Sequence, residues 1–86
     1  MKEFTYTIQD PVGMHARPAG RLVKEAANYH STVTILKDDK KADTRRLMAL
    51  MGLAIKAGQT ITVQVEGPDE ETAAPALKQF LTENRF

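Results

Sequence analysis

Hydrophobic and polar residues alternate along the first positions of the chain. Phe4, Tyr6 and Ile8 are apolar, and threonine stands between them at positions 5 and 7. This period of two predicts a β-strand with one buried face, because successive side chains of a strand point to opposite sides of its sheet. The same alternation and the turn signal Asp38-Asp39 predict further strands over residues 32–35, 40–42 and 61–65.

Other segments carry apolar residues at helical spacing. A first helix is expected to begin near Ala16 to Pro18 and to reach about Tyr29, and a second to follow a cap on Asp43 or Thr44 and to end near Gly58. A third is expected to begin near Asp69, with Leu77, Phe80 and Leu81 on its apolar face. Pro18 suits an opening turn, where its missing N–H would have no partner, and its ring favours extended geometry at Arg17. Pro75 conflicts with an undistorted helix from Asp69, so that helix is expected to start near Thr72 or to bend there.

The order of these elements, βαββαβα, predicts an α+β domain of two layers. Helices cover one face of the sheet, and the other face is open to water. No repeat or linker interrupts the 86 residues, so we expect a single domain over residues 1–86. A domain of this size buries one modest core, which favours a carrier or a binding module over a self-contained enzyme.

Composition argues against several kinds of function. Cysteine is absent, which excludes disulfides, thiol nucleophiles and cysteine metal sites. The net charge of +1 lacks the positive excess typical of dedicated nucleic-acid-binding proteins. With no signal-peptide pattern and no long apolar run, we expect a cytoplasmic protein without membrane insertion. The two histidines lack companion ligands at metal-site spacing, so we expect no metal and no cofactor.

The segment Gly13–Ala19, Gly-Met-His-Ala-Arg-Pro-Ala, joins the first strand to the first helix. It places His15 and Arg17 where the unpaired N–H groups of a first helical turn attract anions, and the N–H groups of Ala16 and Arg17 are the expected backbone ligands of phosphate. Because imidazole can act as a nucleophile, we interpret His15 as the residue that carries the phosphate. In the alternative interpretation His15 is an ordinary solvated surface residue. His30 is expected at the end of the first helix, where the helix dipole favours a cation, and it has no comparable neighbours.

The chain resembles the HPr family, the histidine-containing phosphocarrier proteins of the phosphoenolpyruvate-dependent sugar phosphotransferase system. The resemblance rests on this segment, on Leu-Met-Ala-Leu-Met-Gly-Leu at residues 47–53, and on the length and order of elements. It implies that His15 receives phosphate on Nδ1 from enzyme I and passes it to the A domain of a sugar-specific enzyme II, while Arg17 helps hold the phosphoryl group. It also implies an open-faced sandwich with a four-stranded antiparallel sheet under three helices. We expect a monomeric phosphoryl carrier rather than an enzyme.

The expected second helix is apolar around more of its circumference than one buried stripe requires. The residues expected to face away from the sheet are Leu47, Met48 and Met51. Flexible methionines suit a surface that must fit several partners, and in HPr proteins the matching positions dock partners beside the active histidine. The alternative is that all the apolar residues of this helix fill the core.

Basic residues form a candidate rim around this surface: Arg17, Arg21, Lys24, Arg45 and Arg46. Arg45 and Arg46 fall in the first turn of the expected second helix, where a positive charge opposes the helix dipole by ~0.3–1 kcal/mol. That cost suggests another use, namely attraction of acidic partners and faster encounter. An ordinary solvated face is the alternative.

Position 46 departs from the family. Many HPr proteins have a regulatory serine there, which a dedicated kinase phosphorylates to weaken phosphotransfer, whereas this chain has Arg46. Regulation by that serine is therefore not possible in this chain. Thr44 lies nearby, but we interpret it as a helix cap and assign it no regulatory role.

A non-catalytic interaction module of the same fold, which would use Met48 and Met51, is a second class of function. Such a module could dispense with a nucleophile, whereas this chain keeps His15 between its expected neighbours. Binding of single-stranded nucleic acid is a more distant alternative, because the three phenylalanines and two tyrosines are not interleaved with basic residues.

Overall fold

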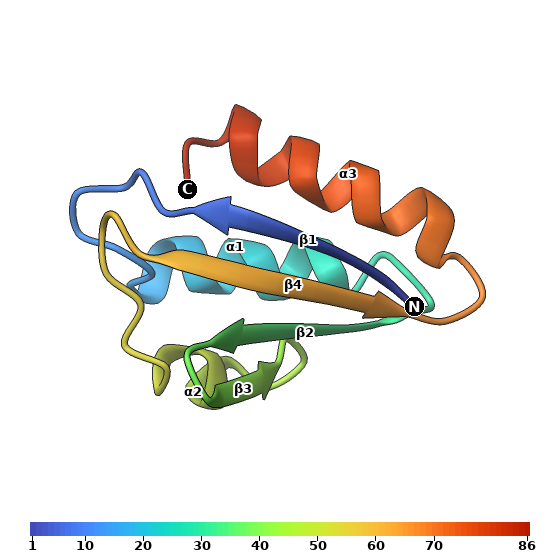
Figure 1. Cartoon of the computed structure of the whole chain (residues 1–86), viewed down its shortest axis with the longest axis horizontal. Coiled ribbons are helices and arrows are strands. Elements are labelled where there is room, and N and C mark those ends of the chain that lie inside the picture. The colour runs from blue at the N-terminus through green and yellow to red at the C-terminus, as the bar shows by residue number, and fades with distance from the viewer.

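The elements occur in the predicted order. In the computed structural model, which describes residues 1–86, they are β1 (Lys2–Thr7), α1 (Ala16–Ala26), β2 (Thr32–Lys37), β3 (Lys40–Asp43), α2 (Leu47–Met51), β4 (Thr60–Glu66) and α3 (Glu70–Glu83). The four strands form one antiparallel sheet in the order β1-β4-β2-β3, as Figure 1 shows. The predicted α+β fold is confirmed.

Strand β4 organises the sheet because it pairs with β1 on one side and with β2 on the other. Val63 of β4 lies opposite Phe4 of β1 and opposite Ile35 of β2. Every second residue of β4 is buried, namely Ile61, Val63 and Val65. The residues between them are exposed or partly exposed. The period of two therefore reflects a sheet with helices on one face only.

The covered face of the sheet and the three helices share one core of 19 buried apolar residues. Leu22 of α1, Leu50 of α2 and Leu77 of α3 are each at most 1% exposed. Full burial of a leucine side chain contributes roughly 1.5–3 kcal/mol, so packing on the sheet is a main source of stability for each helix. None of the helices combines the length and apolar character that crossing a bilayer requires.

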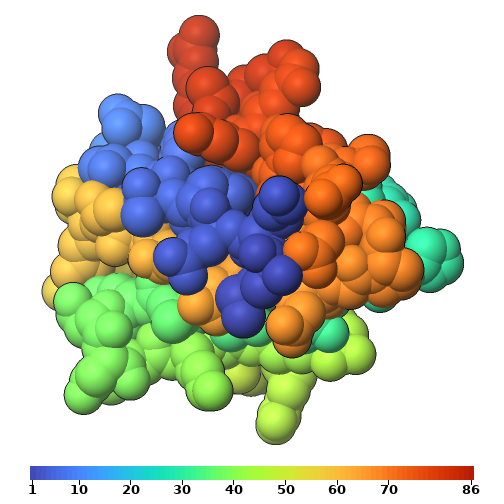
Figure 2. All heavy atoms as spheres, turned by 45° about the vertical axis from the view of Figure 1, so that its right-hand side comes forward, coloured from blue at the N-terminus to red at the C-terminus, as the bar shows by residue number.

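The start of β1 and the start of α3 meet at one end of the molecule. The Met1 amino group lies 2.8 Å from Glu70 Oε2, and Glu70 Oε1 accepts the Gly67 backbone N–H at 3.1 Å. Figure 2 shows the dark-blue N-terminal residues against orange residues of this region. The loop that carries His15 lies at the opposite end of the sheet, where β1 leads into α1 (Figure 1).

Helix α2 begins later than predicted, and neither Asp43 nor Thr44 caps it. Thr44 is 1% exposed, and its hydroxyl donates to the Val33 carbonyl at 3.0 Å. The Asp43 carboxylate accepts the backbone N–H of Arg45 at 2.9 Å. The predicted caps are wrong because both side chains hold the chain as it leaves the sheet, ahead of the helix.

The predicted end of this helix near Gly58 is also wrong. Lys37, at the end of β2, donates from Nζ to the carbonyls of Leu53 and Ala54 at 3.0 Å each. Ala54 has a positive φ of 51°. A left-handed residue stops a helix, and here a lysine from a distant strand binds the carbonyls beside it. The segment from α2 to β4 is consequently a connection of turns and irregular backbone.

The other two helices differ from prediction at their ends. α1 ends at Ala26, about one turn earlier than expected. α3 begins at Glu70 and contains Pro75, so of the two alternatives the start near Thr72 is wrong, and the bend stays a prediction. Pro75 and Glu71 are both exposed, and water can therefore reach the Glu71 carbonyl that loses its helical partner at the proline.

Candidate functional site

His15 occupies the N-cap position of α1. Its backbone is extended, with φ of −87° and ψ of −172°, and its carbonyl accepts the Ala19 N–H at 3.0 Å. Its own N–H donates to the Gly13 carbonyl at 2.9 Å. The side chain is 39% exposed. The backbone of His15 is thus fixed at the helix start while its imidazole is accessible from solvent.

The loop before His15 packs closely on the segment that follows α2. The Met14 N–H donates to the Ile55 carbonyl at 2.9 Å, and the Met14 side chain is buried. Gly13 has a φ of +82°, and a Cβ at this position would stand 2.5 Å from the Ile55 oxygen. Only glycine accommodates both the left-handed backbone and this close approach. The contact with Ile55 could not be read from the local sequence.

Arg17 lies in the first turn of α1 and is helical. The prediction that Pro18 gives Arg17 an extended backbone is therefore wrong. A proline as the third helical residue costs no intrahelical bond, because the first N–H groups of a helix have no partner within it. Pro18 is also buried, so packing favours the helical arrangement. The Arg17 side chain is exposed and forms no salt bridge within the chain.

The structure therefore brings together the groups that the sequence singled out for binding an anion. The N–H groups of Ala16 and Arg17 open α1 and have no backbone acceptor. The His15 ring and the Arg17 side chain extend from the same helix start. A guanidinium and free N–H groups can donate hydrogen bonds to a phosphoryl group, and an imidazole nitrogen with a free lone pair can bond to its phosphorus.

Asp10 was not singled out from the sequence, yet it lies against His15. Its Oδ2 is 3.7 Å from His15 Nε2, and its Oδ1 accepts the Val12 N–H at 2.8 Å. Its backbone N–H donates to the Phe86 carbonyl at 2.9 Å. An aspartate five positions before a histidine is a weak signal by itself, because the contact depends on how the loop folds.

An exposed apolar surface lies on α2. Met48 is 78% exposed and Leu47 is 37% exposed, whereas Leu50 is fully buried. Met51 is half-buried and packs against the core. The interpretation in which the whole helix fills the core is therefore wrong for Leu47 and Met48. Val12 of the His15 loop, which the sequence analysis did not single out, is also an exposed apolar residue.

Arg45 does not stand in the first turn of α2 as expected. It precedes the helix, and Arg46 is the N-cap residue. Arg45 Nη2 lies 2.6 Å from Asp43 Oδ2, and the hydrogen bonds from Arg45 lower the pKa of the Asp43 carboxyl. The expected cost of Arg45 against the helix dipole therefore does not arise within the first turn, and Arg45 pairs with a neighbouring carboxylate instead. Arg46 is exposed.

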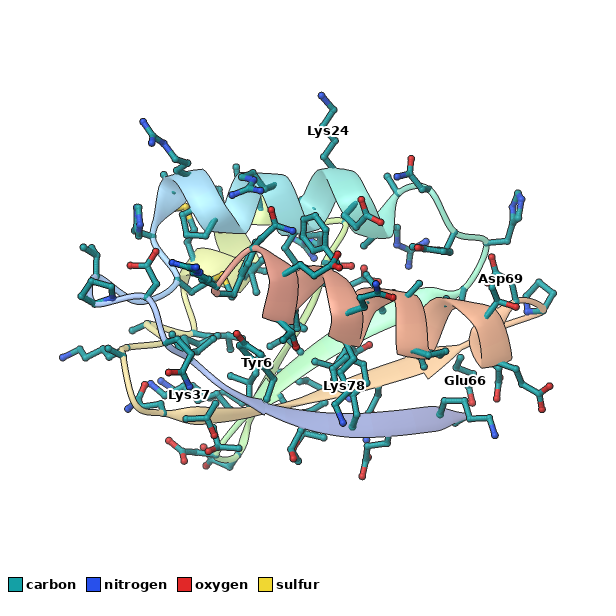
Figure 3. The ribbon with its side chains drawn as sticks, turned by 90° about the horizontal axis from the view of Figure 1, so that it is seen from above. Tyr6, Lys24, Lys37, Glu66, Asp69 and Lys78 are labelled. Atoms are coloured by element: carbon teal, nitrogen blue, oxygen red, sulfur yellow. The ribbon has the colours of Figure 1, made fainter.

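The two basic residues of α1 differ in their surroundings. Arg21 donates from Nη2 to Asn84 Oδ1, and its guanidinium lies 5.9 Å and 5.8 Å from the ring centroids of Phe80 and Phe86. This side chain ties α1 to the end of α3. Lys24 is exposed and points away from the helix into solvent (Figure 3).

Two further residues can be placed in relation to the site. His30 is exposed on the connection after α1, at the far end of the helix from His15, where its backbone N–H donates to Asp69 Oδ2 at 2.9 Å. Thr44 is buried and hydrogen-bonded, as described above. Neither side chain contributes to the group of residues around His15.

Similarity to known proteins extends over nearly the whole chain. Residues 2–83 match the family model described as the PTS HPr component phosphorylation site. A phosphocarrier protein HPr of Lysinibacillus sphaericus is 42% identical over 83 residues, which are 96% of this chain and 94% of the relative. The solved structure of a Mycoplasma histidine-containing phosphocarrier protein superimposes with a TM-score of 0.91 at 39% identity, covering 98% of this chain and 96% of that chain. An HPr dimer of Thermoanaerobacter tengcongensis gives a TM-score of 0.76 at 35% identity, covering 100% of this chain and 99% of that chain.

Proposed function

The chain belongs to the HPr family of phosphocarrier proteins, and from that premise we propose that His15 accepts a phosphoryl group from phosphorylated enzyme I and passes it to the A domain of a sugar-specific enzyme II. The observation that carries this proposal is the position of His15 at the N-cap of α1, next to the unpaired N–H groups of Ala16 and Arg17. The exposed guanidinium of Arg17 completes the site.

The chemistry of histidine suits a carrier, which must release its phosphoryl group as readily as it accepts it. The lone pair of Nδ1 attacks phosphorus, a nitrogen–phosphorus bond forms, and the bond from phosphorus to the donor breaks with its electron pair on the donor. The bound group carries roughly two negative charges near neutral pH. Arg17 and the N–H groups of the helix start offset that charge by charge-assisted hydrogen bonds. A nitrogen–phosphorus bond keeps a high transfer potential, so the next acceptor can take the group.

In this proposal the partner enzymes supply most of the transition-state stabilisation. The site of this chain is a shallow, exposed arrangement at the start of one helix, with a half-exposed imidazole. Such a site can hold a phosphoryl group, but water is excluded from the reacting atoms only when a partner covers it. We therefore assign the chain the role of a phosphoryl carrier that is transiently modified on His15.

We assign partner docking to the exposed apolar side chains of Leu47 and Met48, with Met51 at the edge of the surface. Helices α1 and α2 are neighbours, so this surface adjoins the helix that begins at His15. Arg46 and Lys24 are exposed and available to acidic partners. Arg21 and Arg45 are already paired within the chain and are expected to contribute less.

The direct test is incubation of the chain with enzyme I, phosphoenolpyruvate and Mg²⁺, followed by mass spectrometry of the intact protein. We expect the mass of one phosphoryl group to be gained and the modification to be labile in acid. His15→Ala should abolish the gain, and His30→Ala, the matched control at the other end of α1, should not change it. Absence of the gain in the unmodified chain, or its persistence in His15→Ala, would contradict the proposal.

Oligomeric state and location are separate from this chemistry. A relative that superimposes on the whole chain is an HPr dimer, so the monomeric state predicted for this chain needs its own measurement by sedimentation equilibrium. The predicted cytoplasmic location also stays a prediction.

A further inference from the structure

We propose that Asp10 is a positioning residue for His15, and that its carboxylate keeps the imidazole proton on Nε2 so that the Nδ1 lone pair is free to attack phosphorus. The inference rests on the proposed function in that it assigns Nδ1 as the nucleophile. It adds a residue that belongs to the loop after β1, outside the segment that the sequence singled out.

The geometry of the carboxylate supports this role. Asp10 Oδ2 lies 3.7 Å from His15 Nε2, which is longer than a hydrogen bond and places the carboxylate beside that ring nitrogen, while Oδ1 accepts the Val12 N–H at 2.8 Å. Each oxygen therefore has a separate partner. The hydrogen bond to Val12 restricts the rotation of the carboxylate, so Oδ2 stays on the side of the imidazole.

The backbone of Asp10 is held as firmly as its side chain. Its N–H donates to the Phe86 carbonyl and its carbonyl accepts the Gly13 N–H, both at 2.9 Å. Phe86 is 2% exposed, so the contact connects Asp10 to the core at the end of α3. The side chain is only 28% exposed. A carboxylate that is partly buried and whose backbone and side chain are both hydrogen-bonded can orient a neighbouring ring.

Asp10 is an acidic group at this site beside two basic ones. Arg17 follows His15 in α1, and Arg85 lines the same surface hollow of about 660 Å³ as Asp10. None of the basic groups can accept a proton from the imidazole, since each already carries its charge. The carboxylate is therefore the group here that favours a proton on the ring nitrogen that faces it.

A neutral imidazole has one protonated nitrogen and one nitrogen with a free lone pair. With the proton on Nε2, Nδ1 forms its bond to phosphorus while the bond from phosphorus to the donor breaks and the donor keeps the electron pair. The ring gains positive charge as the bond forms, and the carboxylate beside Nε2–H stabilises it. When the group moves on, the Nδ1–P electron pair returns to Nδ1 and the proton is still on Nε2. No external proton is required in either direction.

Asp10→Asn tests the inference with little change of shape. The Asn Oδ1 can keep the Val12 hydrogen bond, which directs the amide NH₂ toward Nε2 and favours the proton on Nδ1 instead. Long-range ¹H–¹⁵N correlation spectra of the unphosphorylated protein report which ring nitrogen is protonated. We expect Nε2–H in the unmodified chain, a shift toward Nδ1–H in Asp10→Asn, and phosphorylation by enzyme I slowed by roughly ten-fold.

The control is Glu66→Gln, which makes the same change of charge at the opposite end of the sheet, where Glu66 is exposed (Figure 3). It should leave the tautomer and the rate unchanged. If Asp10→Asn fails to fold, Asp10→Ser supplies a hydroxyl acceptor for Val12 without a carboxylate, and it should also lose the preference for Nε2–H. An unchanged tautomer in a folded variant overturns the inference. An unmodified chain that shows Nε2–H but is never phosphorylated would overturn the proposed function and leave the positioning contact standing.

Discussion

Gly13 and Ile55 approach each other so closely that a Cβ on Gly13 would stand 2.5 Å from the Ile55 carbonyl oxygen. The two residues belong to different connections, one before α1 and the other between α2 and β4. Their contact, with the Met14 N–H bound to the same oxygen at 2.9 Å, holds the His15 loop on the body of the domain. The position of the imidazole therefore depends on a segment far along the chain.

Gly13→Ala should lower both the stability of the domain and the rate of phosphorylation. The added Cβ must displace the Ile55 carbonyl, and the alanine backbone must adopt a φ of +82°. We expect a loss of about 3 kcal/mol in the free energy of unfolding. Gly58→Ala is the matched control, because Gly58 has a similar φ of +84° but open space around it. It should cost about 1 kcal/mol. Equal urea denaturation midpoints for the two variants would contradict the role assigned to the contact.

Met48→Glu should slow phosphotransfer from enzyme I while leaving the fold intact. Met48 is 78% exposed, so glutamate there removes an apolar contact with a partner and no core packing. Met51→Glu should slow transfer and also destabilise the domain, because Met51 packs against the core. Thr72→Glu, an exposed position in α3, controls for the added charge. Thermal unfolding measures the stability of each variant, and the rate of phosphorylation by enzyme I measures the transfer. Loss of the fold in Met48→Glu would favour a structural role for Met48 instead.

Raising the salt concentration should reduce the association rate with enzyme I, because the exposed basic residues attract an acidic partner over a distance that salt shortens. Arg46→Gln should weaken this dependence. Arg45→Gln should weaken it less, because Asp43 already pairs with Arg45 at 2.6 Å. Stopped-flow rates over a range of salt concentrations measure the two slopes. A rate independent of salt would remove the electrostatic role from all of these residues.

Incubation with an HPr kinase and ATP should leave the chain unlabelled near α2. Position 46 is an arginine, and the nearby Thr44 is 1% exposed with its hydroxyl bound to the Val33 carbonyl. A kinase could phosphorylate Thr44 only after that part of the sheet opened. Peptide mapping after the reaction is the measurement. The variant Arg46→Ser serves as the positive control, and a labelled Thr44 in the unmodified chain would show that this region opens.

Asp69 should stabilise the domain near neutral pH, and this contribution to stability should be lost in acid. The Ser31 hydroxyl and the His30 N–H donate to its carboxylate and lower its pKa below the ordinary value of 3.8. A carboxyl group with a lowered pKa in the folded state adds stability above its ordinary pKa, and that stability is lost as the pH falls through the folded-state value. The difference in urea midpoint between the unmodified chain and Asp69→Asn should therefore be largest near neutral pH and shrink below about pH 4. Asp39→Asn, in the exposed β2–β3 turn, should show no such trend.

The local pattern of apolar residues and prolines was sufficient to predict the order of the elements and the start of α1. Alternation over residues 61–65 predicted β4 because a sheet covered on one face imposes a period of two on any strand within it. His15 was expected just before a helix because a proline three residues on marks a first turn, and it stands at the N-cap. These features depend on neighbours within a few positions, which the sequence displays directly.

The length of α2 could not be predicted in this way. Leu50 and Leu53 continue the helical spacing, yet the helix ends at Met51, Ala54 has a positive φ, and the Lys37 side chain binds the carbonyls of Leu53 and Ala54. The surroundings of Arg21 could not be predicted either. Its place on a basic stripe did not reveal that its guanidinium binds Asn84 and lies against two aromatic rings. In each case the deciding partner lies on another element.

The sequence by itself determined which residues form strands and helices, which faces are apolar, and that a histidine and an arginine stand at the start of a helix. Only the tertiary structure decided that Asp10 faces the imidazole, that Ile55 supports the His15 loop, and which of the two interpretations of α2 holds, with Met48 exposed and Leu50 buried. The physical reason is that periodicity and turn chemistry act between near neighbours, whereas contacts between distant segments depend on how the whole core packs.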